Sequence, residues 1–183
     1  MAHSSLASDR FDESKLAEEL AHELVERLFR DHYRGLCAFV RDYVYSLDVA
    51  EEIVQELFLR VWDHARDGDC QRLTRAYLYA AARNHAVSIL RHERVVRAHE
   101  ATAINEASYG SAPTAQEKVE SDELALAARR AIARLPAKCR QVFSLSRDHE
   151  LTYAEIANVL GISVKTVELH MTRALKALRS SLP

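Results

Sequence analysis

Residues Leu151–Arg179 read LTYAEIANVLGISVKTVELHMTRALKALR, and their pattern is the most informative in the chain. Two apolar-periodic segments lie on either side of Gly161, and Thr152 and Ser163 can cap the helices that they predict. Glu155 follows Thr152 by three residues, as in a capping box, and a glycine adopts positive φ cheaply at a sharp turn. We therefore expect two short helices with a shared core of Ile156, Ala157, Leu160, Val167, Met171, Ala174 and Leu178.

This spacing is typical of a DNA-binding helix-turn-helix, in which the second helix enters the major groove. From Gly161 onward, four Lys and Arg residues stand against Glu168 alone, in a chain whose net charge is −2. The alternative is a helical hairpin with solvated charges. The side chains that we expect to face DNA are Ser163, Lys165, Thr166, Glu168, Leu169, Thr172 and Arg173, with the first three placed at phosphates.

The composition favours an all-α protein. Among 183 residues there are only 4 Gly and 3 Pro, too few for the many turns of an all-β fold. The slightly acidic balance excludes a uniformly basic nucleic-acid coat, so DNA contacts must come from local patches. No apolar run approaches the ~20 residues of a membrane span, and the polar N-terminus lacks the apolar segment of a secretion signal. We expect a cytoplasmic protein with no membrane insertion.

The cysteines and histidines predict no metal site, cofactor or catalytic group. Three widely spaced cysteines do not suit a disulfide framework, and no Cys-x-x-Cys occurs. The string His22–Glu26 is similar to a zincin motif but lacks its second His. A metalloenzyme or metal sensor is therefore disfavoured.

The periodicity divides the chain into a flexible tail (1–12), a helical domain (13–97), a linker (98–120) and a second helical domain (121–183). Leu16, Leu20, Leu24 and Leu28 predict one apolar helix face, and the helix either continues to Ser46 or breaks near Gly35. Asp48 is the expected cap of a second helix. A third should cover about 75–97, and the linker is either a tether or, through its acids, a nucleic-acid mimic.

The C-terminal segment resembles region 4 of the sigma-70-family transcription initiation factors, which reads the −35 promoter element. The preceding Ala133–Phe143, ARLPAKCRQVF, is similar to the Leu-Pro-containing helix start of that region. Many extracytoplasmic-function (ECF) members carry Arg-Ser-Arg where this chain has Glu168, Leu169 and His170. The −35 preference of those members is therefore not transferable, and His170 is either a buried, hydrogen-bonded residue or a DNA contact.

The N-terminal half resembles region 2 of the ECF sigma factors. Asp48–Trp62, DVAEEIVQELFLRVW, is similar to the family's region 2.2 helix, which docks on the β′ clamp coiled coil of RNA polymerase. The resemblance implies polymerase contacts along the polar side of this helix. The residues concerned are Asp48, Glu51, Glu52, Gln55, Glu56 and Arg60.

Arg75–Arg91, RAYLYAAARNHAVSILR, resembles the family's region 2.3–2.4 helix. In the family, this helix and the loop before it open the DNA duplex at the −10 element and read its bases. The residues that the resemblance assigns to this element are Arg75, Arg83, Asn84 and Arg91. The loop 66–74 would form a pocket for an unstacked base. Tyr77 and Tyr79 offer rings for stacking on DNA, although at least one is expected in the core.

The resemblance implies an ECF sigma factor with two small helical domains. It would bind core RNA polymerase, through the β′ clamp coiled coil and the β flap, and promoter DNA. It implies an anti-sigma factor as a further partner, and a monomer is expected when the protein is free. The alternative is a stand-alone helix-turn-helix regulator of duplex DNA, but the first half shows no βαβ pattern of a receiver domain.

Overall fold

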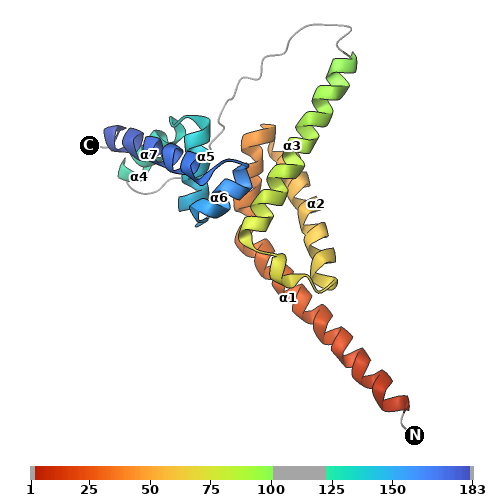
Figure 1. The fold of residues 1–183 in the computed structure, drawn as a ribbon. Helices are drawn as coiled ribbons and strands as arrows, with labels where there is room; N and C mark the ends of the chain where they lie inside the picture. Colours follow the sequence, from red (N-terminus) through yellow and green to blue (C-terminus); the bar gives the residue numbers. More distant parts are fainter. Residues whose placement is uncertain (1–2, 101–122, 182–183) are drawn as a thin grey trace. The chain divides into compact units, whose positions relative to one another are not determined.

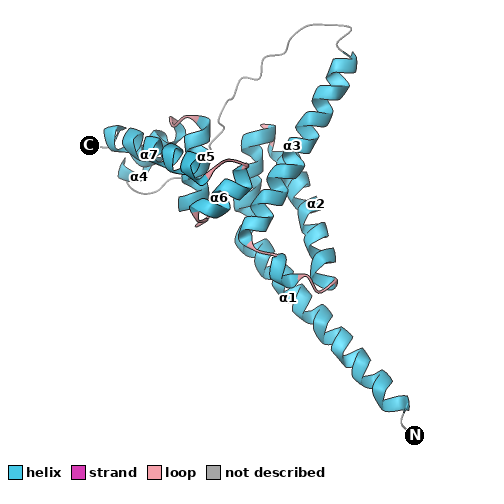
Figure 2. Cartoon of the chain, in the orientation of Figure 1, coloured by secondary structure: helices cyan, strands magenta, loops and turns pink. Residues whose placement is uncertain are grey.

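The computed structural model describes residues 3–100 and 123–181, and in these residues every regular element is a helix (Figures 1 and 2). The contacts divide the chain into two units, Met1–Glu93 and Arg94–Pro183. The expected all-α fold of two helical domains is confirmed. The helices are α1 (His3–Val44), α2 (Leu47–Arg66), the 3-10 helix η1 (Cys70–Arg72), α3 (Arg75–Glu100), α4 (Glu123–Ala133), α5 (Ala137–Arg147), α6 (Tyr153–Leu160) and α7 (Val164–Ser181).

Helix α1 is longer than expected at its N-terminal end. We predicted a flexible tail over 1–12 and a helix from Glu13, but the helix continues back to His3. Residues 3–34 contain neither Gly nor Pro, so no residue in this stretch is a strong helix breaker. Gly35 does not interrupt α1, which resolves the open alternative in favour of one helix. The expected linker 98–120 lies outside the described residues from 101 onward.

The first unit is built on α1 and α2, which pack along each other. Leu36 and Val40 of α1 are fully buried, and the ring of Phe39 meets that of Tyr79 from α3 with centroids 5.2 Å apart. Each such large apolar side chain contributes about 1.5–3 kcal/mol through its burial. The buried face of α2 consists of Ala50, Ile53, Val54, Leu57, Phe58, Val61 and Ala65.

Only part of the predicted leucine face of α1 is buried. Leu28 is buried and Leu24 is half-buried, whereas Leu16 and Leu20 remain 58% and 56% exposed. Next to Leu20, Ala21 is buried and His22 meets the ring of Trp62 from α2, so at this level a different side of α1 faces α2. The periodicity predicted the helix correctly but not how much of its apolar face is covered.

Ser46, not Asp48, caps α2. The Ser46 hydroxyl accepts a hydrogen bond from the backbone N–H of Val49 at 3.4 Å, and Ser46 has extended backbone angles. The chain reverses at Tyr45, whose φ is 56°, so the helix begins before Asp48. Asp48 instead lies in the first turn, where a carboxylate is favoured by the helix dipole.

The second unit contains the predicted helix-turn-helix. Thr152 and Glu155 form a complete capping box at the start of α6, and Ser163 accepts from the N–H of Thr166 at 3.1 Å at the start of α7. Gly161 turns the chain with φ 65° and ψ 40°. The predicted core residues Ile156, Ala157, Leu160, Val167, Met171 and Ala174 are all buried, and Leu178 is partly buried.

Replacing Gly161 with Ala should destabilise the second unit by about 1–2 kcal/mol, because a Cβ is strained in the left-handed conformation. Urea unfolding followed by far-UV circular dichroism measures the loss. Gly161→Asn is the control and should lose less, since Asn tolerates this conformation. Trp62, the sole tryptophan, lies in the first unit, and its fluorescence transition should not move. Equal stability of the Ala variant and the wild type would contradict the left-handed conformation of Gly161.

Candidate nucleic-acid interface

Helix α7 separates an apolar inner face from a polar outer face. Val167, Met171 and Ala174 are buried, and the first turn of the helix is fixed by the tight turn at Gly161. Of the seven predicted DNA-facing side chains, Thr166 is half-buried and the other six are exposed: Ser163, Lys165, Glu168, Leu169, Thr172 and Arg173. The sequence therefore identified the outer face of this helix correctly, while the DNA contacts themselves stay a prediction.

Three hydroxyls on this face already have partners within the helix. Ser163 and Thr166 share a hydrogen bond of 2.8 Å between their hydroxyl oxygens, in addition to the capping bond. The Thr172 hydroxyl donates to the carbonyl oxygen of Glu168 at 2.8 Å. By contrast, Lys165, Glu168 and Arg173 form no ion pair with any other residue that the structure describes. These charges are therefore the groups of the face most available to an external partner.

His170 has a partner inside the second unit. Its Nδ1 lies 3.6 Å from the Sγ of Cys139 on α5, and His170 is half-buried while Cys139 is buried. Of the two alternatives open for this residue, the geometry favours the internal one. His170 thus links α7 to α5 rather than extending the outer face.

The outer side of α2 is a polar face in which some residues have internal partners. Asp48, Glu52, Gln55, Glu56 and Arg60 are exposed and Glu51 is half-buried. Glu56 pairs with Arg60 at 3.5 Å and with Nε2 of His85 on α3 at 3.2 Å. Burial raises the pKa of Tyr33 on α1. A hydrogen bond with Gln55 lowers this pKa, but it is the smaller effect.

Asp48 and Glu52 stand out on this face. They form no ion pair or side-chain hydrogen bond with another described residue. Leu59, which the sequence analysis missed, lies farther along α2 and is 68% exposed. The sequence contains a signal for this exposure, because Leu59 follows Gln55 by four residues and therefore lies on the polar side of the helix.

The predicted −10 residues are spread along α3. Asn84 and Arg91 are exposed, while Arg83 and Arg75 are half-buried. The Arg83 guanidinium donates to Oδ1 of Asn84 at 3.4 Å, which orients the amide. Arg75 lies near His32 of α1: burial is the main cause that lowers the pKa of His32, and the charge of Arg75 adds to it.

The two tyrosines of α3 differ in their surroundings. Tyr79 is fully buried against Phe39 and belongs to the core. Tyr77 is half-buried and meets the His64 ring edge-on, with centroids 6.3 Å apart. The preceding loop turns at Gly68, with φ 86°, and the Cys70 thiol donates to the carbonyl oxygen of Ala65 at 3.6 Å. The structure therefore leaves Tyr77 as the ring accessible to a base.

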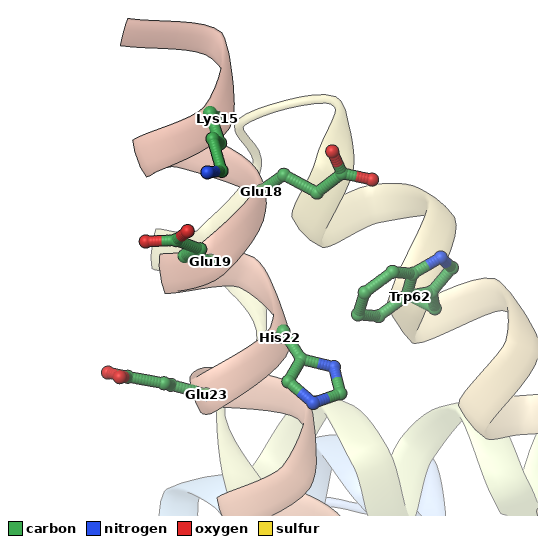
Figure 3. Close-up of a pocket in the computed structure, with 6 residues that line it drawn as sticks. All are labelled: Lys15, Glu18, Glu19, His22, Glu23 and Trp62. Atoms are coloured by element: carbon green, nitrogen blue, oxygen red, sulfur yellow. The ribbon is translucent and has the colours of Figure 1, made fainter. Parts of the chain in front are cut away.

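A groove that the sequence did not predict lies between α1 and the end of α2 (Figure 3). It encloses about 470 Å³, and His22 meets Trp62 edge-on at 5.7 Å. Glu18 and His22 lie on the side of α1 nearer Trp62, whereas Glu19 and Glu23 point away from it. No group of three or more His, Cys, Asp or Glu side chains suited to a metal gathers among the residues that the structure describes.

Comparison with known proteins matches both halves of the chain. Residues 28–95 match the family model "Sigma-70 region 2", and residues 125–178 match "Sigma-70, region 4". ECF RNA polymerase sigma factor SigL of Mycobacterium tuberculosis is 31% identical over 162 residues, which cover 87% of this chain and 89% of that protein. SigW of Bacillus subtilis is 27% identical over 94% of this chain and 95% of that protein.

The chain belongs to the ECF sigma factors of the sigma-70 family. Its function is that of an RNA polymerase sigma factor, and the stand-alone regulator is not favoured. Sigma factors of this family bind core RNA polymerase and promoter DNA. The outer faces of α2, α3 and α7 in this sigma factor therefore belong to regions 2 and 4.

Solved structures show the same fold. The sigma factor RpoE of Bartonella quintana, crystallised with the anti-sigma factor NepR, has a TM-score of 0.58 at 21% identity, over 85% of this sigma factor and 94% of RpoE. CnrH, solved with the cytosolic domain of CnrY, has a TM-score of 0.53 at 22% identity, over 91% and 92% of the two chains. Among the described helices of this sigma factor, none has the length and apolar content that a membrane span requires.

Proposed function

We propose that this sigma factor directs core RNA polymerase to promoters by holding the −35 element on α7 and capturing the melted −10 element on α3. The observation that carries the proposal is the two-faced geometry of α7. Its inner side chains lock the helix-turn-helix core, while Lys165 and Arg173 remain exposed beside the unpaired Glu168. A helix held rigidly in this way can present side chains to a major groove.

The −10 role rests on α3. Asn84 and Arg91 are seven residues apart and therefore lie on the same side of the helix, both exposed. An amide can form hydrogen bonds with a base edge, and arginines can follow the backbone of a single strand. Tyr77 is the ring that could stack on an unpaired base.

The polymerase contact rests on α2. Asp48 and Glu52 are exposed, one helical turn apart and without internal partners among the described residues. Leu59 adds an exposed apolar side chain to the same helix. We assign the β′ clamp coiled coil to this face and the β flap to the second unit, as the family resemblance implies.

The remaining assignments follow from this role. The protein supplies no reaction chemistry, which the polymerase provides, and it works in the cytoplasm as a monomer until it binds polymerase. RpoE was crystallised with the anti-sigma factor NepR, and CnrH was solved with the cytosolic domain of CnrY. We assign an anti-sigma factor to this sigma factor as well.

The proposal is tested by promoter selection with reconstituted holoenzyme. Core polymerase with the protein should enrich DNA that carries two conserved elements at a fixed spacing, while core polymerase alone should enrich neither. Because each unit makes few DNA contacts, the protein alone should bind the same DNA weakly and with a strong salt dependence. Tight, specific duplex binding without polymerase would instead support a stand-alone regulator.

Arg173→Ala should reduce transcription from promoters that depend on their −35 element by about tenfold, the cost of one lost base or phosphate contact. Arg173 is exposed and forms no ion pair among the described residues, so its removal should not unfold α7. Multi-round transcription on promoters with an intact and a scrambled −35 element measures the effect. Arg129→Ala, on the exposed side of α4, is the control. An unchanged preference for the intact element would remove Arg173 from the contact set.

A further inference from the structure

The outer face of α7 places an acid directly beside an apolar side chain. Glu168 is exposed, and Lys165, three residues earlier, is not within ion-pair distance of it. Leu169 is the next residue and is 48% exposed. Helix surfaces that meet only phosphates carry cations and hydroxyls, so this pair calls for another explanation.

A carboxylate on a DNA-facing helix is repelled by phosphates unless a base donates a hydrogen bond to it. In the major groove only cytosine N4 and adenine N6 carry amines. On adenine the amine lies beside the N7 acceptor, which repels a carboxylate, whereas cytosine offers its amine without that acceptor. An unpaired Glu168 therefore suits a cytosine.

Leu169 and Thr172 present apolar groups to the same region. They are one turn apart on the exposed side of α7. The Thr172 hydroxyl donates its proton to the Glu168 carbonyl oxygen at 2.8 Å, so it has no proton to donate to DNA, and its methyl is the apolar group that it can present there. The thymine methyl is the apolar group that the major groove offers to such side chains.

We infer that α7 reads a −35 element in which Glu168 accepts a hydrogen bond from a cytosine and Leu169 and Thr172 contact the methyl of an adjacent thymine. Because Glu168 and Leu169 are consecutive, the two bases belong to the same or neighbouring base-pair steps. The inference rests on the proposed function, in which α7 enters the −35 major groove, and it adds the base content of that element.

The first test is promoter selection with reconstituted holoenzyme from DNA randomised at both elements. The wild type should enrich cytosine at one −35 position. At that position, Glu168→Gln should enrich adenine over cytosine by about tenfold, because an amide pairs with adenine N6 and N7 together. Lys165→Gln is the matched control on the same face and should lower the yield without changing any preferred base.

The second test isolates the thymine methyl. In the selected sequence, replacing the adjacent thymine with deoxyuridine removes one methyl group. Holoenzyme with the wild-type protein should bind this DNA about fourfold more weakly, while holoenzyme with Leu169→Ala should lose little further affinity. Additive losses from the two changes would show that Leu169 does not contact that methyl.

The two kinds of failure are distinguishable. If the wild-type holoenzyme enriches a −35 element without cytosine, or if Glu168→Gln keeps the same base, the inference is wrong while the proposed function stands. If the wild type enriches no −35 element, the proposed role of α7 fails, and the inference fails with it.

Discussion

Replacing Asp48 and Glu52 together with Lys should weaken binding to core RNA polymerase at least tenfold. The two carboxylates lie one turn apart on the exposed face of α2 and have no internal partner among the described residues. Reversing both charges changes the electrostatic complementarity of this face while leaving its packing intact. Titration of labelled protein with core polymerase at physiological salt measures the change.

The matched control reverses two charges elsewhere on the same unit. Glu19→Lys with Glu23→Lys makes an equal change in net charge on α1, where both side chains point away from Trp62 (Figure 3). This control should bind core polymerase as the wild type does. Asp48 lies in the first turn of α2, so a far-UV spectrum must confirm that its loss has not unwound the helix. Equal affinities of the two double variants would contradict the assignment of the α2 face.

Asn84→Ala should reduce stable open complexes about tenfold and leave polymerase binding unchanged. The amide is exposed on α3 and is oriented by Arg83, so its removal takes away base-edge hydrogen bonds without opening the core. Ala is also a better helix former than Asn, so a loss cannot come from a weaker α3. Permanganate footprinting of unpaired thymines measures opening, on a promoter obtained by selection.

Glu23→Ala provides the comparison for Asn84. Glu23 is exposed on α1, outside the proposed −10 face of α3. Open complexes with this variant should match those of the wild type. If Asn84→Ala also opens the promoter normally, Asn84 does not read the −10 element.

Local patterns in the sequence predicted the second unit well. Thr152, Glu155, Gly161 and Ser163 act through neighbours three or four residues away, so their caps and turn depend little on the rest of the fold. The helical periodicity of α7 also predicted that Val167 is buried while Lys165 is exposed. Exposure of the outer face followed directly from that periodicity.

Features that depend on packing between helices were harder to predict. The cap of α2 moved to Ser46 because the chain reverses at Tyr45, a turn without a clear sequence signal. Leu16 and Leu20 continue the predicted apolar face of α1 but stay exposed, whereas Ala21 beside Leu20 is buried.

The internal partners of candidate site residues were also not predictable from the sequence. Glu56 meets His85, and His170 meets Cys139, across 29 and 31 positions of the chain. Neither pair has a periodic signature. These contacts decide which polar side chains remain available, and they leave Asp48 and Glu52 as the strongest candidates on α2.

Co-elution of the purified protein with bacterial core RNA polymerase on size exclusion measures whether this sigma factor binds polymerase through α2. We expect a stable one-to-one complex that Asp48→Lys with Glu52→Lys disrupts and Glu19→Lys with Glu23→Lys does not. Separate elution of wild-type protein and core polymerase, together with sequence-specific binding of duplex DNA by the protein alone, would contradict a sigma-factor role.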